Sequence, residues 1–146
     1  MIDLFDIKGK VALITGSTHG LGMAMAKGLG KAGATIVVNG NSSQQKIDDA
    51  VAALKSEGIN AVGYRFNVTE EQEVIAAVQK IESEVGPIDI LINNAGIIKR
   101  IPLLEMEVAD FREVIDIDLV SPFIVSKHVA KGMIDRRQGK IINICS

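Results

Sequence analysis

Short, unbroken apolar runs alternate along this chain with longer segments whose apolar residues recur at helical spacing. The apolar runs occupy residues 11–14, 35–38, 88–92 and 140–144. An apolar run without polar alternation is typical of a strand buried on both faces, as in parallel sheets that carry helices on each side. The alternation therefore predicts an α/β fold in which helices cover both faces of a doubly wound parallel sheet.

The segments between the apolar runs carry helix signals. Apolar residues recur at helical spacing through residues 21–29, at Ile47, Val51 and Leu54, and at Val74, Val78 and Ile81. Strand and helix patterns therefore follow one another in the order expected of consecutive βαβ units.

Local signals predict where these helices begin and end. The two serines at 42–43 can cap the second helix, and Gly58 follows its end. Thr69 with Gln72 predicts a capping box at the start of the third helix. Gly-Pro at 86–87 ends that helix.

Composition narrows the class of protein. The chain has 146 residues, 47% hydrophobic and 23% charged, without a repeat or linker, so we expect one packed domain over residues 1–146. A net charge of −2 and only five aromatic side chains argue against a nucleic-acid partner. The N-terminus does not resemble a signal peptide, and no apolar run approaches the roughly 18 residues of a membrane span. We therefore expect a cytoplasmic protein with no membrane partner.

Cysteine and histidine give no metal signal. The one cysteine, Cys145, cannot form an internal disulfide, and nothing around it has the spacing of a zinc site. His128 stands alone on a predicted helix, which favours a surface or packing role. We expect Cys145 to be a buried thiol and the chain to bind no metal.

The first apolar run leads directly into a glycine-rich loop, GSTHGLG, at residues 16–22. Glycine lets backbone approach a pyrophosphate, and the N-terminus of the following helix offers unpaired N–H groups and its positive dipole end. The same glycines would also let a helix pack closely on a strand without any ligand, and that alternative stays open here. A P-loop is excluded, because the Gly-Lys pairs at 9–10 and 139–140 lack the serine or threonine that must follow.

A second motif, NNAG at residues 93–96, ends the run 88–92 and so falls at the carboxyl edge of the same sheet, where such folds bind ligands. Together, TGxxxGxG at 15–22 and NNAG resemble the short-chain dehydrogenase/reductase family, over residues 8–146. The strings most similar to members that act on gluconate lie at 93–102, 114–118 and 141–146. The resemblance implies a Rossmann-type sheet, here truncated after the fifth strand, and hydride transfer between a nicotinamide cofactor and a carbonyl.

The resemblance also implies which residues bind the cofactor. They are Gly16, Thr18, His19, Gly20, Leu21, Gly22, Asn41, Ser42, Asn67, Val68, Asn94, Ala95 and Gly96. The glycine loop would line the pyrophosphate, and residues 94–96 would lie beside the adenine ribose. Asn67 replaces the aspartate that is usual at the adenine, and its amide oxygen can still accept from the adenine amino group. Asn93 is expected instead to hold its strand to a helix through side-chain hydrogen bonds.

The end of the second strand bears on the choice between NAD and NADP. NAD enzymes of this fold place a carboxylate about twenty residues after the glycine loop, where it holds the ribose 2′-hydroxyl. Residues 39–43 read NGNSS, without an acid. Hydroxyls, amides and His19 suit a 2′-phosphate, although no arginine or lysine stands ready to pair it. We therefore expect NADP, with NAD as the alternative.

Catalysis in the family implied by the resemblance requires a serine and a Tyr-x-x-x-Lys pair, which supply a proton to the developing alkoxide. Ser146 matches the serine. The single tyrosine, Tyr64, lies in a predicted strand and has Val68 four residues later, so these residues do not contain the pair. We expect the 146 residues alone to be inactive.

A further catalytic position, usually asparagine, is Asp118 here. Because Pro122 has no N–H, the Asp118 carbonyl would lose its helical partner and the helix would bend. The resemblance implies that this carbonyl anchors a water of a proton relay. A bend that serves packing alone is the alternative.

Lys99 and Arg100 follow the NNAG motif, near where a substrate would stand. Arg100 could pair a substrate carboxylate through two hydrogen bonds, whereas we expect Lys99 to be a solvated surface charge. The resemblance implies a homotetramer that takes a small sugar acid and interconverts D-gluconate and 5-keto-D-gluconate. The alternatives are a 2-deoxy-gluconate 3-dehydrogenase, a 3-oxoacyl-acyl-carrier-protein reductase, and a nucleotide-binding fragment without catalysis.

Overall fold

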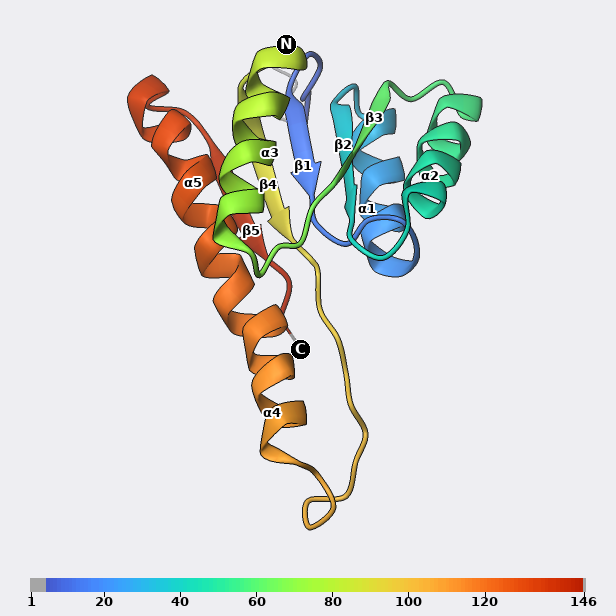
Figure 1. Ribbon diagram of the computed structural model, residues 1–146. Coiled ribbons are helices and arrows are strands. Elements are labelled where there is room, and N and C mark those ends of the chain that lie inside the picture. The colour runs from blue at the N-terminus through green and yellow to red at the C-terminus, as the bar shows by residue number, and fades with distance from the viewer. Residues whose placement is uncertain (1–4, 146) are drawn as a thin grey trace.

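One parallel sheet organises the computed structural model, which describes residues 5–145. Its strands are β1 (Val11–Ile14), β2 (Thr35–Gly40), β3 (Ala61–Arg65), β4 (Ile88–Asn93) and β5 (Lys140–Asn143). Their order across the sheet is β3-β2-β1-β4-β5, so the chain moves outward from β1 to β3 and then crosses back to β4. All strands run in the same direction, and their carboxyl ends share one edge of the sheet (Figure 1).

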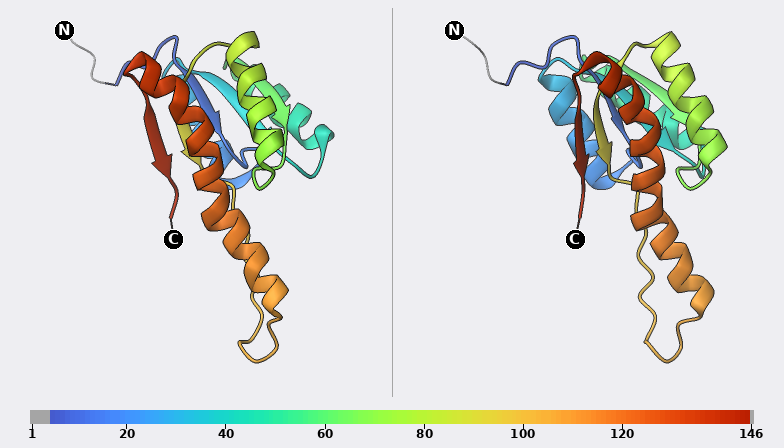
Figure 2. Two further views of the ribbon diagram at one scale, coloured as in Figure 1. Left: turned by 60° about the vertical axis from the view of Figure 1, so that its left-hand side comes forward. Right: turned by 90° about the vertical axis from the view of Figure 1, so that its left-hand side faces the viewer.

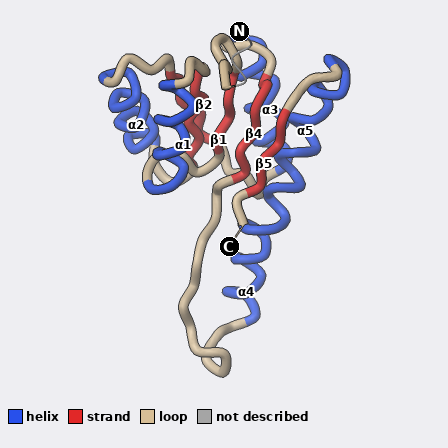
Figure 3. Tube along the Cα trace, turned by 180° about the vertical axis from the view of Figure 1, so that it is seen from behind, coloured by secondary structure: helices blue, strands red, loops and turns tan. Residues whose placement is uncertain are grey.

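Helices cover both faces of this sheet. They are α1 (Gly20–Lys31), α2 (Gln44–Ser56), α3 (Glu71–Glu84), α4 (Val108–Ile115) and α5 (Ser121–Arg136). α1 and α2 lie on one face, and α3 and α5 lie on the other (Figures 1 and 3). The predicted doubly wound parallel sheet is therefore confirmed. Within the described residues, no helix combines the length and the apolar character needed to cross a membrane.

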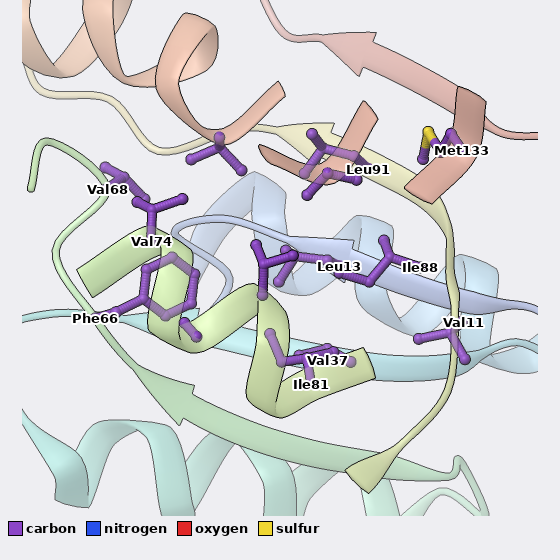
Figure 4. Close-up of a cluster of buried hydrophobic side chains, with 14 residues drawn as sticks. Val11, Leu13, Val37, Phe66, Val68, Val74, Ile81, Ile88, Leu91 and Met133 are labelled. Carbon is purple, nitrogen blue, oxygen red and sulfur yellow. The ribbon is translucent and has the colours of Figure 1, made fainter. Parts of the chain in front are cut away.

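β1 is buried on both faces, as its unbroken apolar run predicts. Leu13 packs with Ile81 of α3 and Met133 of α5 in one core cluster (Figure 4). Ile14 points to the opposite face, where it packs with Ile47 of α2 in a second cluster. Cores on both sides hold the central strands in place, and this fixes the position of the loops at their carboxyl ends.

Three of the predicted boundary signals act as expected. Ser43 caps α2, since its Oγ accepts a hydrogen bond from the Lys46 N–H at 3.4 Å. Gly58 follows the end of α2 with a φ of +78°, which is the conformation that favours glycine there. Gly86 has a φ of +140° beyond the end of α3.

The predicted capping box of the third helix is wrong. α3 begins after Glu70, which provides no side-chain cap. The N–H and hydroxyl of Thr69 both donate to Oδ1 of Asn67, at 3.0 and 2.8 Å. The asparagine two residues earlier therefore engages the threonine in a local turn, and Glu70 rather than Thr69 holds the N-cap position of α3.

α4 and α5 are joined by π-helical turns at Asp116–Val120 into one long rod, which extends past the carboxyl edge together with the loop at 94–107 (Figure 2). Pro122 lies in the first turn of α5 and has no N–H to complete the regular helical pattern. The Ser121 hydroxyl donates to the Ile117 carbonyl at 2.7 Å inside these turns. The helix is therefore irregular just before Pro122, with wider π-helical turns at the place where the sequence predicts a bend.

β5 forms one edge of the sheet, and all four of its residues are exposed. Ile141 and Ile142 are 37% and 47% exposed. Cys145, which follows this strand, is exposed as well, so the prediction of a buried thiol is wrong. The strand that precedes the thiol lies at an edge of the sheet rather than within the layered core.

Candidate nucleotide-binding site

The glycine loop at residues 16–22 is fixed by hydrogen bonds from the end of β2. The Gly16 N–H donates to Oδ1 of Asn39 at 3.1 Å, and the Ser17 N–H donates to the Asn39 carbonyl at 3.0 Å. Asn39 is only 2% exposed, and its Nδ2 donates to the Phe66 carbonyl at 3.1 Å. This bridging role was not predicted, although a lone asparagine at the end of an apolar strand is the signal that indicates it.

Thr15 joins the glycine loop to the NNAG turn. Its Oγ1 accepts hydrogen bonds from the N–H groups of Asn94 and Ala95, each at 3.0 Å. In return, Nδ2 of Asn94 donates to the carbonyls of Thr15 and Gly16, at 3.1 and 3.0 Å. Two motifs about eighty residues apart in sequence therefore form one hydrogen-bonded unit at the carboxyl edge of the sheet.

Two glycines of the loop serve different purposes. A Cβ on Gly22 would lie 2.5 Å from the Gly16 carbonyl oxygen and 2.6 Å from Nδ2 of Asn94, so only glycine fits where α1 meets the loop. Gly20 has a φ of +59°, and a Cβ there would meet no atom within 4 Å. The close approach of neighbouring atoms therefore requires glycine at residue 22. At residue 20 the positive φ favours glycine, and the space beside its backbone is open.

These residues surround a pocket of about 410 Å³, a volume within the usual range for small-molecule sites. All thirteen residues predicted to bind the cofactor line it: Gly16, Thr18, His19, Gly20, Leu21, Gly22, Asn41, Ser42, Asn67, Val68, Asn94, Ala95 and Gly96. The pocket is also lined by Gly40, Ser43, Lys46, Ile97 and Ile117, which were not predicted.

The electrostatics of the pocket suit an anion. The N-terminal residues of α1 and α2 both line it, and neither helix has an acidic residue in its first turn. His19, which precedes α1, makes no side-chain cap, so its ring leaves the first N–H groups of that helix to other acceptors. Unpaired helix N–H groups and the positive dipole end favour phosphate groups.

The structure places a lysine, Lys46, at the pocket where the sequence predicted no cation for the 2′-phosphate. The sequence predicted no arginine or lysine near the end of β2, but Lys46 lines the pocket together with Ser42 and Ser43. Its place in the first turn of α2, three residues after the capping Ser43, brings it back toward the loop. The position of the helix start, which the serines indicate, is the signal that could have found it.

Asn67 lines the pocket, but its amide oxygen is not free for adenine. Oδ1 already accepts both hydrogen bonds from Thr69. The Asn67 N–H in turn donates to the Glu73 carboxylate at 2.8 Å. The expected bond from the adenine amino group to this oxygen is therefore not available in this arrangement, since both of its lone pairs are used.

Asp118 lies behind the NNAG turn. Its Oδ1 accepts a hydrogen bond from the Ile97 N–H at 2.9 Å, and the neighbouring Ile117 lines the pocket. A Cβ on Gly96 would come within 3.2 Å of the same oxygen. The carboxylate thus ties the π-helical turns to the pocket wall. Ser146, the other predicted catalytic residue, lies outside the described residues.

Asn93 makes the contacts predicted for it. Its Nδ2 donates to Oγ of Ser126 in α5 and to Oδ1 of Asn143 in β5, each at 2.9 Å. It is 4% exposed and is not among the residues that line the pocket. Asn93 therefore holds β4 to its neighbours beneath the site.

The two cations after the NNAG motif differ. Lys99 is not a solvated charge, because its Nζ pairs with Asp110 at 2.7 Å and with Glu113. These bonds, the one to Asp110 foremost, raise the pKa of Lys99. Arg100 is exposed and does not line the pocket.

Other polar features lie away from the pocket. His128 contacts the Glu71 carboxylate at 2.8 Å and so packs α5 against α3, as predicted. In the part of the chain that the structure describes, no three metal-ligating side chains gather. A larger hollow of about 960 Å³ lies along β3 between α2 and α3, but it contains none of the glycine loop.

Comparisons with known proteins place these features in context. Residues 10–146 match the short chain dehydrogenase family. Over 145 residues the chain is 79% identical to a 2-dehydro-3-deoxy-D-gluconate 5-dehydrogenase of Formosa agariphila, covering 99% of this chain and 55% of that protein. It is 47% identical over 146 residues to the 5-keto-D-gluconate 5-reductase of Escherichia coli K12, covering 100% of this chain and 57% of that protein.

A solved structure agrees with the fold. The gluconate 5-dehydrogenase from Burkholderia cenocepacia J2315, in complex with NADP and tartrate, matches with a TM-score of 0.91 and 44% identity, over 97% of this chain and 55% of that one. The chain thus spans about half the length of the relatives it matches. Because the family model matches residues 10–146, nearly the whole chain, the chain belongs to the short-chain dehydrogenase/reductase family.

Proposed function

We propose that this chain is the nucleotide-binding portion of an NADP-dependent oxidoreductase that acts on a gluconate-type sugar acid. The observation that carries the proposal is the convergence of the glycine loop, the first turn of α2 and the NNAG turn on one pocket of about 410 Å³. The similarity to a gluconate 5-dehydrogenase in complex with NADP supports this cofactor.

The residues of the pocket fit NADP. The open backbone at Gly20 and the uncapped N-terminus of α1 suit the pyrophosphate. Residues 94–96 would lie beside the adenine ribose, and Val68 beside the adenine. Asn41 and Ser42 would lie near the 2′-phosphate, where no carboxylate at 39–43 would repel it. When bound, NADPH supplies a hydride to the substrate carbonyl.

We propose roles for three further residues. Asp118 holds the pocket wall through Ile97, and its main-chain carbonyl lies in the π-helical turns, where irregular pairing can leave it to hold a relay water. Ser146 would donate to the substrate oxygen as charge develops on it. Arg100, with its exposed guanidinium, would pair the carboxylate of the sugar acid.

The substrate is proposed from the names of the relatives. Both the Formosa and the Escherichia proteins are named for chemistry at carbon 5 of a gluconate-type acid. The 79% identity favours 2-dehydro-3-deoxy-D-gluconate as the substrate to be oxidised, with the D-gluconate and 5-keto-D-gluconate pair as the second candidate. We also propose a homotetramer, because α4 and α5 expose apolar side chains such as Phe111 and Phe123, at 57% and 67%. We propose that this assembly is cytoplasmic.

Turnover assays on the protein that carries this chain, at its natural length, test the proposal. We expect the NADPH absorbance at 340 nm to rise or fall with one of the two substrate pairs, and to change little or not at all with a 3-oxoacyl thioester. A rate with the thioester that exceeds both sugar-acid rates would contradict the substrate class. A rate that depends only on NAD would contradict the cofactor.

A further inference from the structure

We propose that Lys46, in the first turn of α2, determines the preference for NADP over NAD by pairing with the ribose 2′-phosphate. The inference rests on the proposed function of the pocket, and it assigns the cofactor discrimination to a helix side chain rather than to the loop that follows β2. Three features of the structure support it: the position of Lys46, its lack of a carboxylate partner, and the donors around it.

Lys46 lies between two hollows. It lines the nucleotide pocket, and it also lines an adjoining hollow of about 430 Å³. Thr18 and His19 of the glycine loop line both hollows as well. Lys46 therefore shares both hollows with the glycine loop, and it shares the nucleotide pocket with residues 40–43, at and just after the end of β2.

The acids of α2 are engaged elsewhere. Nε2 of Gln44 donates to Asp48 at 2.9 Å, and Nε2 of Gln45 donates to Asp49 at 2.8 Å. Asp49 also lines the adjoining hollow, but within residues 5–145 no ion pair joins Lys46 to any carboxylate. The charge of Lys46 is therefore left to an outside anion.

Other lysines of the fold show the contrast. Lys27 and Lys31 both pair with Glu57, at 2.6 and 3.0 Å. Lys127 pairs with Glu71 at 2.9 Å. These three lysines connect α1 to the end of α2 and α5 to α3, whereas Lys46 lines the pocket and has no such ion pair within the described residues.

Neutral donors complete the subsite. Ser42 and Ser43 line the same part of the pocket, and the first turn of α2 carries the positive end of the helix dipole with no acid to cancel it. A 2′-phosphate is strongly anionic and accepts several hydrogen bonds, whereas the 2′-hydroxyl of NAD is neutral. The ammonium therefore gains a charge-assisted bond only with NADP, and the gain appears as a difference between the two cofactors.

The test compares K46Q with K55Q in the protein that carries this chain. Lys55 lies on the same helix but lines the hollow along β3. Dissociation constants are measured by calorimetry for NADPH, NADH, 2′,5′-ADP and 5′-AMP, with circular dichroism to confirm that each variant is folded. We expect K46Q to weaken NADPH and 2′,5′-ADP by about tenfold or more, as for loss of a charged hydrogen bond. In K46Q, binding of NADH and 5′-AMP should change by less than about twofold. In K55Q, binding of all four ligands should be unchanged. K46R keeps the positive charge and should retain most of the wild-type preference for NADPH.

The outcomes separate this inference from the proposed function. If the unmodified protein prefers NADPH and K46Q keeps the same ratio of the two dissociation constants, Lys46 does not discriminate and the proposed function stands. If K46Q weakens all four ligands equally, Lys46 supports the pocket without selecting the cofactor. If the unmodified protein binds neither cofactor, both the inference and the proposed function are overturned.

Discussion

At the scale of single residues, one buried hydroxyl joins the two motifs of the nucleotide pocket. Thr15 is 2% exposed, and its Oγ1 accepts from two consecutive N–H groups of the NNAG turn. An isolated turn could not satisfy these donors by itself, because they point toward the end of β1. The threonine therefore explains why the turn and the glycine loop hold a fixed distance from one another.

Thr15→Val tests this role. Valine keeps the shape of threonine but leaves the N–H groups of Asn94 and Ala95 without their acceptor. We expect the free energy of unfolding in urea to fall by about 1–3 kcal/mol, the usual cost of unsatisfied buried donors, and NADPH binding to weaken. Thr15→Ser keeps the hydroxyl and should retain most of the NADPH affinity. A valine variant with unchanged stability and affinity would show that the hydroxyl does not hold the turn.

At the scale of elements, the junction of α1 with the glycine loop sets the shape of the pocket. The helix approaches so closely that residue 22 has no room for a side chain, since the Gly16 carbonyl and the Asn94 amide occupy that space. The same helix contains Gly28, where a Cβ would meet no atom within 4 Å. One helix thus offers a crowded and an open glycine for comparison.

Gly22→Ala should displace the helix from the loop, whereas Gly28→Ala should not. We expect Gly22→Ala to lower the melting temperature and to weaken NADPH binding by tenfold or more, because the close contacts cannot relax without moving backbone. Gly28→Ala should be neutral or stabilising by up to about 1 kcal/mol, since alanine favours a helix over glycine. Equal effects of the two substitutions on melting and on binding would argue against the close approach at Gly22.

A hydrogen bond from Tyr64 of β3 to Glu84 of α3 gives a prediction that can be tested by absorbance. Burial first, and then the 2.5 Å hydrogen bond from its hydroxyl to Glu84, raise the pKa of Tyr64 to about 12 from the ordinary value of 10.0. Between these two pH values an unfolded chain loses the proton and the folded chain keeps it, so stability falls as the pH rises through this window.

Tyr64 can be followed alone, because the chain has one tyrosine and no tryptophan. We expect the absorbance of this residue at 295 nm to titrate well above pH 10 in the folded chain and at a lower pH in Glu84→Gln. Glu105→Gln, a change in the loop before α4, serves as the control. Circular dichroism at each pH must show that the chain is still folded. A midpoint near 10 in the folded chain would contradict the contact with Glu84.

At the scale of the whole molecule, the sequence predicted the fold well because unbroken apolar runs and helical spacing both depend on burial, which the sheet and its covering helices satisfy. It also predicted which motifs meet, since the carboxyl ends of parallel strands share one edge. The sequence did not predict the surroundings of residues whose neighbours depend on where a helix begins or on how two elements pack together. Lys46 was missed because its place depends on where α2 begins, and the pairing of Lys99 depends on α4 folding back over the loop.

Local competition accounts for two other differences. Asn67 Oδ1 accepts both hydrogen bonds from Thr69, so the amide oxygen expected to be free is already used. The same turn places Glu70 rather than Thr69 at the N-cap of α3. Cys145 follows an apolar strand that the sequence could not distinguish from a central one, but β5 lies at an edge of the sheet. Pattern alone carries no information about which strand ends up at the edge.

The pocket between the glycine loop, α2 and the NNAG turn is proposed to bind NADP. The most direct measurement is a calorimetric titration of the protein that carries this chain with NADPH and with NADH, at the same pH and ionic strength. The positive first turn of α2 and the absence of an acid at 39–43 predict a dissociation constant for NADPH at least about tenfold below that for NADH. Equal constants, or tighter binding of NADH, would contradict the account.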